Sequence, residues 1–435
     1  MTQYGRAAAV VGLSAGLALG SGGTALAQVP AADPASGVSA AQNGAPGGSG
    51  FRLAPSGRPT LQLPFGEIQF RGRVAGTVQS PARDRGTALP DPGWQTARLQ
   101  VEGTLFTRLE FEVSREFGDP EEPERDLFAN FRVTRGFELR GGQFKVPFGR
   151  DALTGGTNLD FVYRSLLGRQ LAPGRDLGVM AHGRVSGRRV AYQAGYFRHD
   201  GDNARTAQTR GGGPALAGRV VVTPLAGRDT PLARLQVGGA VVTSRLDDVL
   251  GLRGRTVFGE GVFFDRVFVN GRRLRRGLEA AWAMGPVSLS GEHMTVSDQR
   301  TGMGAAETDL PTVTASGWYV AGTWVLTGER KDGRVEPAHS LFDDGHGALE
   351  LTARVERLGF GTSAQFPALT ASPLTPLPAA NADRVVTVGL SWYLTRHLKL
   401  TGNAVFESLG DPARSPEPEG DGRVPTAVVQ FQFVL

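Results

Sequence analysis

Runs in which polar and apolar residues alternate cover most of the chain from Gly66 onward. In the first run, GEIQFRGRVAGTVQ, the apolar side chains of Ile68, Phe70 and Val74 share one parity, whereas charged and amide side chains take the other. Successive side chains of a β-strand point to opposite faces, so a period of two predicts a strand with one apolar and one polar face.

The same alternation recurs to the end of the chain and predicts about sixteen strands. The clearest later segments are 98–105, 109–113, 127–133, 349–356 and 398–404. Weaker candidates are 137–145, 177–185, 190–197, 217–223, 234–242, 274–282, 286–295, 314–326, 384–395 and 426–435. Each is close to the ~10 residues with which a tilted strand crosses a membrane, and an even number of strands closes a single-chain antiparallel barrel.

Alternation also fits a soluble β-sandwich, but two features favour a membrane barrel. Aromatic residues stand near strand ends, as in an interfacial girdle; they are Trp282, Trp318, Tyr319, Trp392 and Tyr393. The chain also ends inside a strand, with Val429, Phe431, Phe433 and Leu435 on one parity. We therefore predict an all-β fold, a transmembrane antiparallel barrel over residues 65–435 that contacts outer-membrane lipid and the barrel-assembly machinery.

The N-terminal segment predicts export. Arg6 precedes an apolar stretch over 7–19, and Ala25-Leu26-Ala27 is a small-x-small cleavage site. We expect a signal peptide at 1–27 and a disordered lead-in rich in Pro, Gly and Ala at 28–64. Export combined with a membrane barrel predicts the bacterial outer membrane as the location.

Composition excludes several classes of function. The chain has no cysteine, so it has neither a disulfide scaffold nor a thiolate site. Its 47 basic and 42 acidic residues give a net charge of +5, too little for a typical nucleic-acid binder. The only lysines are Lys145, Lys331 and Lys399, and the other basic residues are arginines. Two alternative explanations of this bias are a GC-rich genome and the selection of arginine for the geometry with which it binds phosphate or carboxylate groups.

Several motifs carry a resemblance to a known family. They are GQFKVPFG at 142–149, NLDFVYRSLLGRQLAPGRDLGV at 158–179, GPVSLSGEHM at 285–294, GWYVAGTWVLTGE at 317–329 and VGLSWYLTRHLKLTGNAVF at 388–406. In this order they resemble the phosphate-selective porin O and P family, from about Gly66 to Leu435. The resemblance implies a homotrimeric, anion-favouring channel of sixteen strands whose third loop folds inward and narrows the pore.

The longest insertion between strand signals in the first half of the chain is the segment 148–176. Its apolar side chains require burial, which packing inside the barrel wall would provide. That arrangement would turn four arginines towards the lumen, near Lys145 at the strand end: Arg150, Arg164, Arg169 and Arg175. Guanidinium groups in a pore select anions. The alternative is that Arg164 and Arg175 pair with Asp160 and Asp176 and only hold the loop in place.

The strand faces of polar parity would line the lumen, and they carry ten basic and nine acidic side chains. Candidate anion contacts among them are Arg71, Arg73, Arg98 and Arg132. Such an even balance is typical of a general porin. Phosphate specificity in the resembled family depends on stacked arginines and central lysines, and Lys145 is the one lysine well placed for that role.

Catalytic and metal chemistry have little support. His339 and His346 are metal-capable, but they lie in an expected external loop, and neither a metal nor a cofactor is predicted. A barrel-embedded lipase would need Ser288 or Ser290 beside His293 on one strand face. Their spacing does not provide this, so no enzyme is predicted.

Two functions from different classes remain. The first is a porin that passes small solutes by passive diffusion, with anions or phosphate as the preferred class. The second is a non-conducting structural or adhesive barrel that acts through loops such as 367–383 and 410–424. Conductance of a planar bilayer distinguishes the two.

Overall fold

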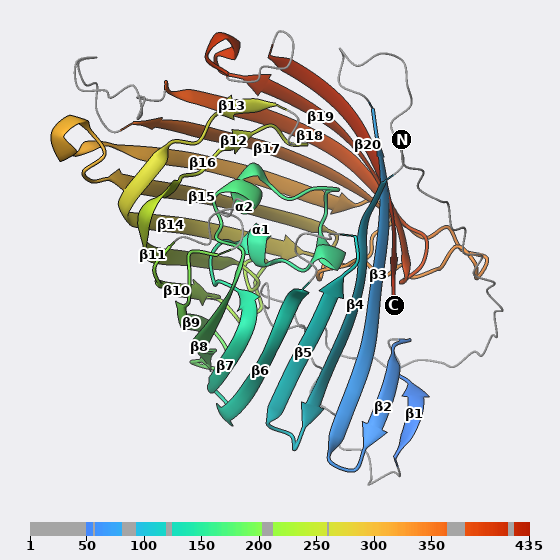
Figure 1. Ribbon diagram of the computed structural model, residues 1–435. Coiled ribbons are helices and arrows are strands. Elements are labelled where there is room, and N and C mark those ends of the chain that lie inside the picture. The colour runs from blue at the N-terminus through green and yellow to red at the C-terminus, as the bar shows by residue number, and fades with distance from the viewer. Residues whose placement is uncertain are drawn as a thin grey trace, which may run out of the picture.

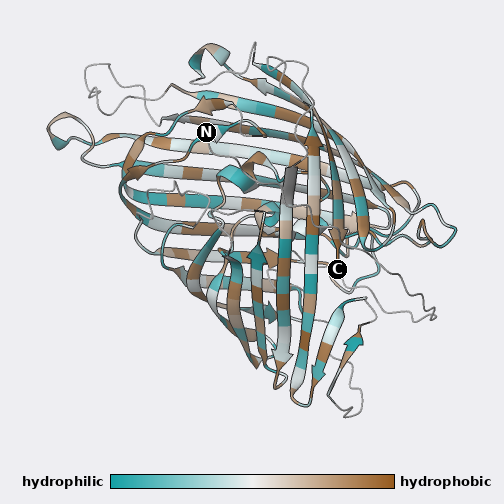
Figure 2. Cartoon of the chain, turned by 45° about the vertical axis from the view of Figure 1, so that its right-hand side comes forward, coloured by the Kyte–Doolittle hydropathy of each residue, from teal (hydrophilic) through white to brown (hydrophobic). Residues whose placement is uncertain are grey.

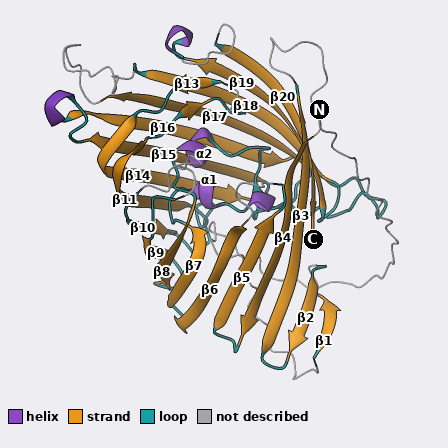
Figure 3. Ribbon diagram, in the orientation of Figure 1, coloured by secondary structure: helices purple, strands orange, loops and turns teal. Residues whose placement is uncertain are grey.

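The computed structural model describes residues 49–54, 57–80, 93–118, 124–201, 212–258, 261–362, 379–415 and 422–435. The predicted signal peptide at 1–27 and the first part of the lead-in lie outside these residues. Figure 1 shows a single curved sheet that wraps around a central space, and Figure 3 shows that helices are few and short. None of the described helices is long and apolar enough to cross a membrane.

Sixteen strands in the described part of the chain close into an antiparallel barrel, which confirms the predicted fold class. They are β3 (Gly66–Gln79), β4 (Gly93–Leu105), β5 (Leu109–Glu116), β6 (Glu124–Thr134), β7 (Phe137–Lys145), β8 (Arg175–Val185), β9 (Val190–Phe197), β10 (Ala215–Val222), β11 (Gln236–Leu250), β14 (Phe268–Met284), β15 (Val287–Arg300), β16 (Leu310–Val325), β17 (Ala348–Thr362), β18 (Asn381–Tyr393), β19 (Leu398–Leu409) and β20 (Arg423–Val434). Each pairs with its neighbours in this order, and β20 pairs back with β3. Every wall strand therefore has two partners.

A short hairpin precedes the barrel and corrects the expectation that all of 28–64 is disordered. Its strands are β1 (Gly50–Leu53) and β2 (Pro59–Leu63), and β2 pairs with the first residues of β3. The last strand pairs with β3 only over residues 73–79. Residues 66–69 would therefore have unpaired backbone groups on that side, and β2 supplies their partners.

The wall has its apolar face outward, as a membrane barrel requires. On β17, Leu351 and Val355 are 46% and 39% exposed, whereas Glu350 and Glu356 beside them are completely buried. Figure 2 shows the resulting alternation of hydrophilic and hydrophobic positions along the strands. A soluble sandwich would bury the apolar parity instead, so the burial excludes that alternative.

Connecting segments reach into the barrel from both rims. The segment 146–174 holds α1 (Arg150–Leu153), η1 (Gly156–Asn158) and α2 (Leu166–Gln170), and Figure 1 shows these helices in front of the inner face of the sheet. The segment 251–267 holds β12 (Gly254–Arg255) and β13 (Val262–Phe264). The segment 326–347 joins β16 to β17 at the opposite rim. Two further helical turns, η2 (Ala305–Glu307) and η4 (Pro412–Arg414), lie in other connections.

Candidate functional site

The segment 146–174 follows β7 and is held in shape by its own polar side chains. Gly149 has a φ of 77°, a conformation that a side chain would oppose, and it turns the chain into α1. Asp151 Oδ2 accepts hydrogen bonds from Ser165 N at 2.9 Å and from Ser165 Oγ at 3.0 Å. Ser165 Oγ accepts from Gly168 N and caps α2. The two short helices therefore form one unit.

Hydrogen bonds attach this unit to the inward faces of β15, β17, β18 and β19. They run from Asp151 N to Glu292 Oε1 (2.8 Å), from Leu166 N to Glu356 Oε2 (2.6 Å), from Val162 N to Asn403 Oδ1 (2.9 Å) and between the Tyr163 and Thr387 hydroxyls. Polar wall side chains thus satisfy backbone groups of the segment that would otherwise be buried without partners.

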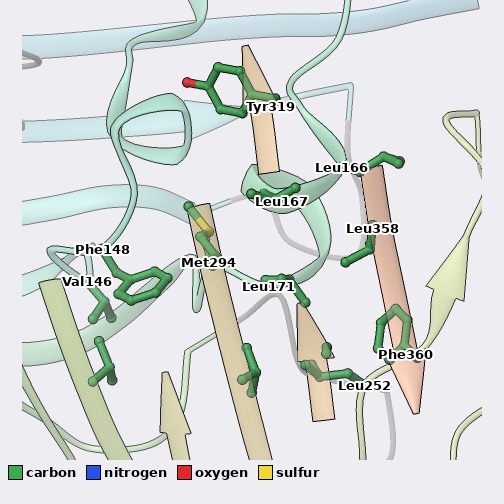
Figure 4. Close-up of a cluster of buried hydrophobic side chains, with 14 of the residues drawn as sticks. Val146, Phe148, Leu166, Leu167, Leu171, Leu252, Met294, Tyr319, Leu358 and Phe360 are labelled. Carbon is green, nitrogen blue, oxygen red and sulfur yellow. The ribbon is translucent and has the colours of Figure 1, made fainter. Parts of the chain in front are cut away.

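Apolar packing holds the same segment against the wall. Leu166, Leu167 and Leu171 are completely buried. Figure 4 shows them among inward-facing wall side chains, including Met294, Tyr319, Leu358 and Phe360. Burying each leucine contributes about 1.5–3 kcal/mol relative to exposure. The apolar residues that required burial in the sequence find it inside the barrel.

The segment 251–267 packs beside the first one. Gln170 and Arg255 exchange hydrogen bonds, Gln170 Nε2 to Arg255 O at 2.6 Å and Arg255 N to Gln170 Oε1 at 2.8 Å. Val257 N donates to Glu407 Oε1 at 2.6 Å. The rings of Phe264 and Phe360 stack with their centroids 4.7 Å apart. Together the two segments cover part of the inner face of β14–β19.

The segment 326–347 approaches from the rim that holds the two-residue turn between β14 and β15. The prediction of an external loop at His339–His346 is therefore wrong, because long loops cluster at the other rim.

Lys331 Nζ lies 2.5 Å from Asp160 Oδ1 and 2.6 Å from Glu350 Oε1. Burial alone would lower the pKa of Lys331, but these carboxylates outweigh it and hold that pKa well above its usual value.

A cavity of about 920 Å³ remains inside the barrel. It is lined by residues of β3–β8, of β11 and of β14–β17, and by the segments 146–174 and 326–347. Its basic lining residues are Arg58, Arg71, Arg73, Arg98, Arg125, Lys145, Arg150, Arg164, Arg169, Arg175, Arg234, Lys331, Arg334, Arg354 and Arg396. Its acidic lining residues are Glu112, Asp126, Asp151, Asp160 and Glu336. The described lining thus carries three basic side chains for each acidic one.

This excess corrects the near balance that strand parity indicated. Of the nine wall acids counted from the sequence, Glu112 alone is among the described lining residues. Most of the others are paired with a basic side chain; Glu102, for example, is 3.1 Å from Arg71 Nη1. Loops and turns add arginines that strand parity does not count. The lumen is therefore more basic than the wall.

Three predicted site residues line the cavity as members of ion pairs. Arg71 pairs with Glu102, Arg98 pairs with Glu116 at 3.1 Å, and Arg175 pairs with Asp126 at 2.8 Å. The expected Arg175 partner, Asp176, bonds instead to backbone N–H groups, among them His199 N. In the first two pairs the carboxylate is buried and the guanidinium is partly exposed, whereas Arg175 and Asp126 are about equally exposed and both line the cavity.

Four others line the cavity but also anchor the segment 146–174. Lys145 Nζ donates to the carbonyls of residues 152, 153 and 154, and Arg164 donates to the carbonyls of 151 and 154. Arg169 donates to Val257 O, and Arg150 Nη1 donates to Gln236 Oε1. The alternative in which Arg164 pairs with Asp160 is wrong, because Lys331 and not Arg164 holds that carboxylate.

The last two predicted residues differ sharply. Arg132 is not among the lining residues; its guanidinium pairs with Glu110 and Glu138. Arg73 lines the cavity, and its buried Nε has no hydrogen-bond partner among the described residues. Gly156 makes room for it, since a Cβ there would lie 2.0 Å from Arg73 Nη1.

Sequence reasoning missed the basic residues of the segment 326–347. Arg334 Nη1 reaches Thr157 O at 3.4 Å, and its Nε and Nη2 have no partner in the described part of the chain. Burial lowers the pKa of Arg334. The length of this connection between two clear strands was the available signal. The lipase alternative also fails, because Ser288 faces inward and bonds to Thr323 while His293 is exposed on the outward parity.

A closed barrel of sixteen antiparallel strands with an apolar outer face and a polar cavity in its lumen defines a porin-type channel of the outer membrane. The chain matches the family described as phosphate-selective porin O and P over residues 75–434, and it belongs to that family. The family and the fold are those of channels. This chain is accordingly an outer-membrane porin.

Solved structures support the fold. The anion-selective porin from Comamonas acidovorans has 14% identity and a TM-score of 0.52, with 85% of this chain and 100% of that chain covered. The outer membrane channel DcaP of Acinetobacter baumannii has 10% identity and a TM-score of 0.54, with 85% and 98% covered. OmpT of Vibrio cholerae in its trimer form has 12% identity and a TM-score of 0.52, with 85% and 100% covered. A comparison with curated proteins finds no match.

Proposed function

We propose that this porin passes small solutes by passive diffusion and prefers anions. The observation that supports the preference is the charge of the cavity, where the described lining carries fifteen basic and five acidic side chains. Positive charge along a narrow channel with walls of low dielectric constant concentrates anions and repels cations. The porin from Comamonas acidovorans, which shares the fold, is anion-selective and agrees with this direction.

The strongest candidates for the selective contact are Arg73, Arg98, Arg164 and Arg334, which we call the Arg73 group. All four line the cavity. Arg73 and Arg334 both lie beside residues 156–157, where Arg73 is next to Gly156 and Arg334 donates to Thr157 O. Arg73 Nε and two nitrogens of Arg334 lack protein partners among the described residues. Donors of this kind need water or an anion, and a guanidinium binds an oxyanion through two parallel hydrogen bonds.

A general preference for anions fits better than phosphate specificity. The resembled family's specificity depends on central lysines, and all three lysines of this chain are engaged. Lys145 binds three carbonyls, Lys331 binds two carboxylates, and Lys399 Nζ donates to Leu159 O at 2.8 Å. Arginine alone would then make the contacts with the permeating ion.

We further infer a homotrimer that contacts outer-membrane lipid and is inserted by the barrel-assembly machinery, and a chain without catalytic activity. The trimer form of OmpT supports the oligomeric state. The outward apolar face supports the contact with lipid. The competing function is a non-conducting structural barrel, and a cavity lined by charged side chains argues against it because a structural barrel has no need of one.

A planar bilayer tests the proposal. The purified porin should give stepwise conductance, and in a KCl gradient its reversal potential should lie on the chloride side. Absence of steps would favour the structural barrel, and a potential on the potassium side would contradict the anion preference.

Variants locate the selective contact. The double variant Arg73→Gln and Arg334→Gln should lower the ratio of chloride to potassium permeability by roughly twofold to twentyfold, since a unit charge about 10 Å away acts with ~0.4–1.7 kcal/mol at an effective dielectric constant of 80 to 20. Arg132→Gln is the matched control, because Arg132 is not among the residues that line the cavity. An equal change in both variants would indicate a diffuse field and not the Arg73 group.

A further inference from the structure

On the outward face of β11, β14, β17 and β18, apolar side chains give way to an arginine at nearly the same distance from one rim of the barrel. Counted from the rim with short turns, Arg245 is the tenth residue of β11, Arg276 the ninth of β14, Arg357 the tenth of β17 and Arg384 the tenth of β18. Membrane-crossing strands have about 9–11 residues. These exposed arginines therefore stand where the hydrocarbon of the outer leaflet meets its headgroups.

Two of them face each other directly. Arg357 and Arg384 are register partners across β17 and β18. The same row continues to Trp318 on β16 in one direction, and to Ser408 on β19 and Arg423 on β20 in the other. Below the row, towards the membrane, Val355 and Val386 are 39% and 37% exposed on the outward face. An interfacial tryptophan and three arginines thus border the apolar belt.

Nothing in the described part of the chain neutralises this pair. Neither Arg357 nor Arg384 has an ion pair or a hydrogen bond to a carboxylate among the described residues. The neighbouring acids Glu356 and Asp383 are fully buried on the opposite face of the wall. Like charges directly opposite on a sheet destabilise it, and next to hydrocarbon water screens them poorly. The pair therefore favours a bound anion, and the described residues supply none.

We propose that Arg357 and Arg384 bind a phosphate group of a phosphorylated lipid in the outer leaflet. Two opposed guanidinium groups can each give a bidentate contact to one phosphate. The acyl chains of that lipid would lie over the apolar belt below, and Trp318 and Ser408 would flank the headgroup. The lipid is favoured over a free anion because the pair lies on the outer face, away from the cavity.

Lipid binding to the purified full-length porin in mild detergent tests this proposal. The probes are a phosphorylated glycolipid purified from outer membranes and the same lipid after enzymatic removal of its phosphates, with retention measured by native mass spectrometry. The wild type should retain the phosphorylated lipid. The double variant Arg357→Gln and Arg384→Gln should bind it roughly tenfold or more weakly, because several charge-assisted hydrogen bonds are lost.

Two controls make the outcome decisive. Arg189→Gln with Arg228→Gln removes two exposed arginines from turns at the opposite rim and should leave lipid binding unchanged. Unchanged single-channel conductance of the Arg357 and Arg384 double variant would show an intact barrel. Equal retention of the dephosphorylated lipid, or full retention by the double variant, would overturn the proposal. If the double variant lost its oligomeric state but kept the lipid, the pair would instead contact a second copy of the chain. If inorganic phosphate alone raised the thermal stability of the wild type and not that of the double variant, the pair would instead bind a free anion.

Discussion

Two halves of one barrel use inward charges for different purposes. The wall of β3–β8 presents its arginines to the cavity, as in the Arg98–Glu116 pair, where the arginine side chain is 22% exposed. The wall of β14–β19 carries a similar pattern, but Glu350 and Glu356 are fully buried beneath the segments from the rims. Strand alternation is the same in both halves, so what covers a strand decides whether its charges serve conduction or architecture.

The cost of a charge differs accordingly. In the covered wall each carboxylate must be paired or hydrogen-bonded, because removal from water costs several kcal/mol per ion. In the open wall a carboxylate such as Glu116 is also buried, but its partner Arg98 is partly exposed, so water shares that work and the pair contributes less. Substitutions on the two sides should therefore affect different observables, stability on the covered side and selectivity on the open side.

The largest effect is expected from Lys331→Met. Its loss leaves the fully buried carboxylate of Glu350 and the partly buried one of Asp160 without their cation, which should lower the free energy of unfolding by about 3–5 kcal/mol. Denaturant titration in lipid vesicles measures this. Arg330→Met, on an exposed neighbour in the same segment that pairs with Asp332, should cost less than about 1 kcal/mol. Equal losses would show that burial does not separate the two positions.

A smaller loss of stability should follow from Leu167→Ala. This side chain is completely buried between α2 and the covered wall, and its truncation should cost about 2–5 kcal/mol and make single-channel current noisier. Leu351→Ala, on the lipid-facing side of β17 at 46% exposure, is the size-matched control. If both variants lost the same stability and neither made the single-channel current noisier, apolar packing would not be what holds the segment 146–174 in place.

The smallest effect on stability should come from Gly156→Ala on the open side. A methyl group there meets only the end of the Arg73 side chain, which can move, so unfolding should change by less than about 0.5 kcal/mol. The displaced guanidinium should still shift the reversal potential towards potassium, by less than Arg73→Gln does. Gly155→Ala, at a neighbouring position with no atom of Arg73 among its contacts, should leave the potential unchanged.

The strands were predictable because alternation is a local property. The sequence itself shows that the apolar Leu351 and Val355 alternate with the charged Glu350 and Glu356. The membrane then decides which of the two sets faces outward. The hairpin of β1 and β2 was not predictable, because β2 is stabilised by the part of β3 that β20 leaves unpaired, which depends on how the barrel closes.

The site was predictable only in outline. Lys145 and the four arginines of the segment 148–176 do line the cavity, since they follow a strand end directly. The ion-pair partners of these residues could not be predicted from the sequence. Arg175, for example, pairs with Asp126, which is 49 residues away. Arg132 has the same parity as Arg98 but stands elsewhere on the wall, and parity alone does not give height along the pore.

The seam between β20 and β3 sets an order for assembly. Across it Gln430 donates to Thr77, residues 353 positions apart in the chain, so this pairing is the most costly in chain entropy and is expected to form late. Before it forms, the edge of β3 is open to pairing with other chains. The adjacent hairpin needs only local contacts and can cover the first residues of that edge early. The staggered closure thus leaves a shorter stretch of unprotected edge during folding.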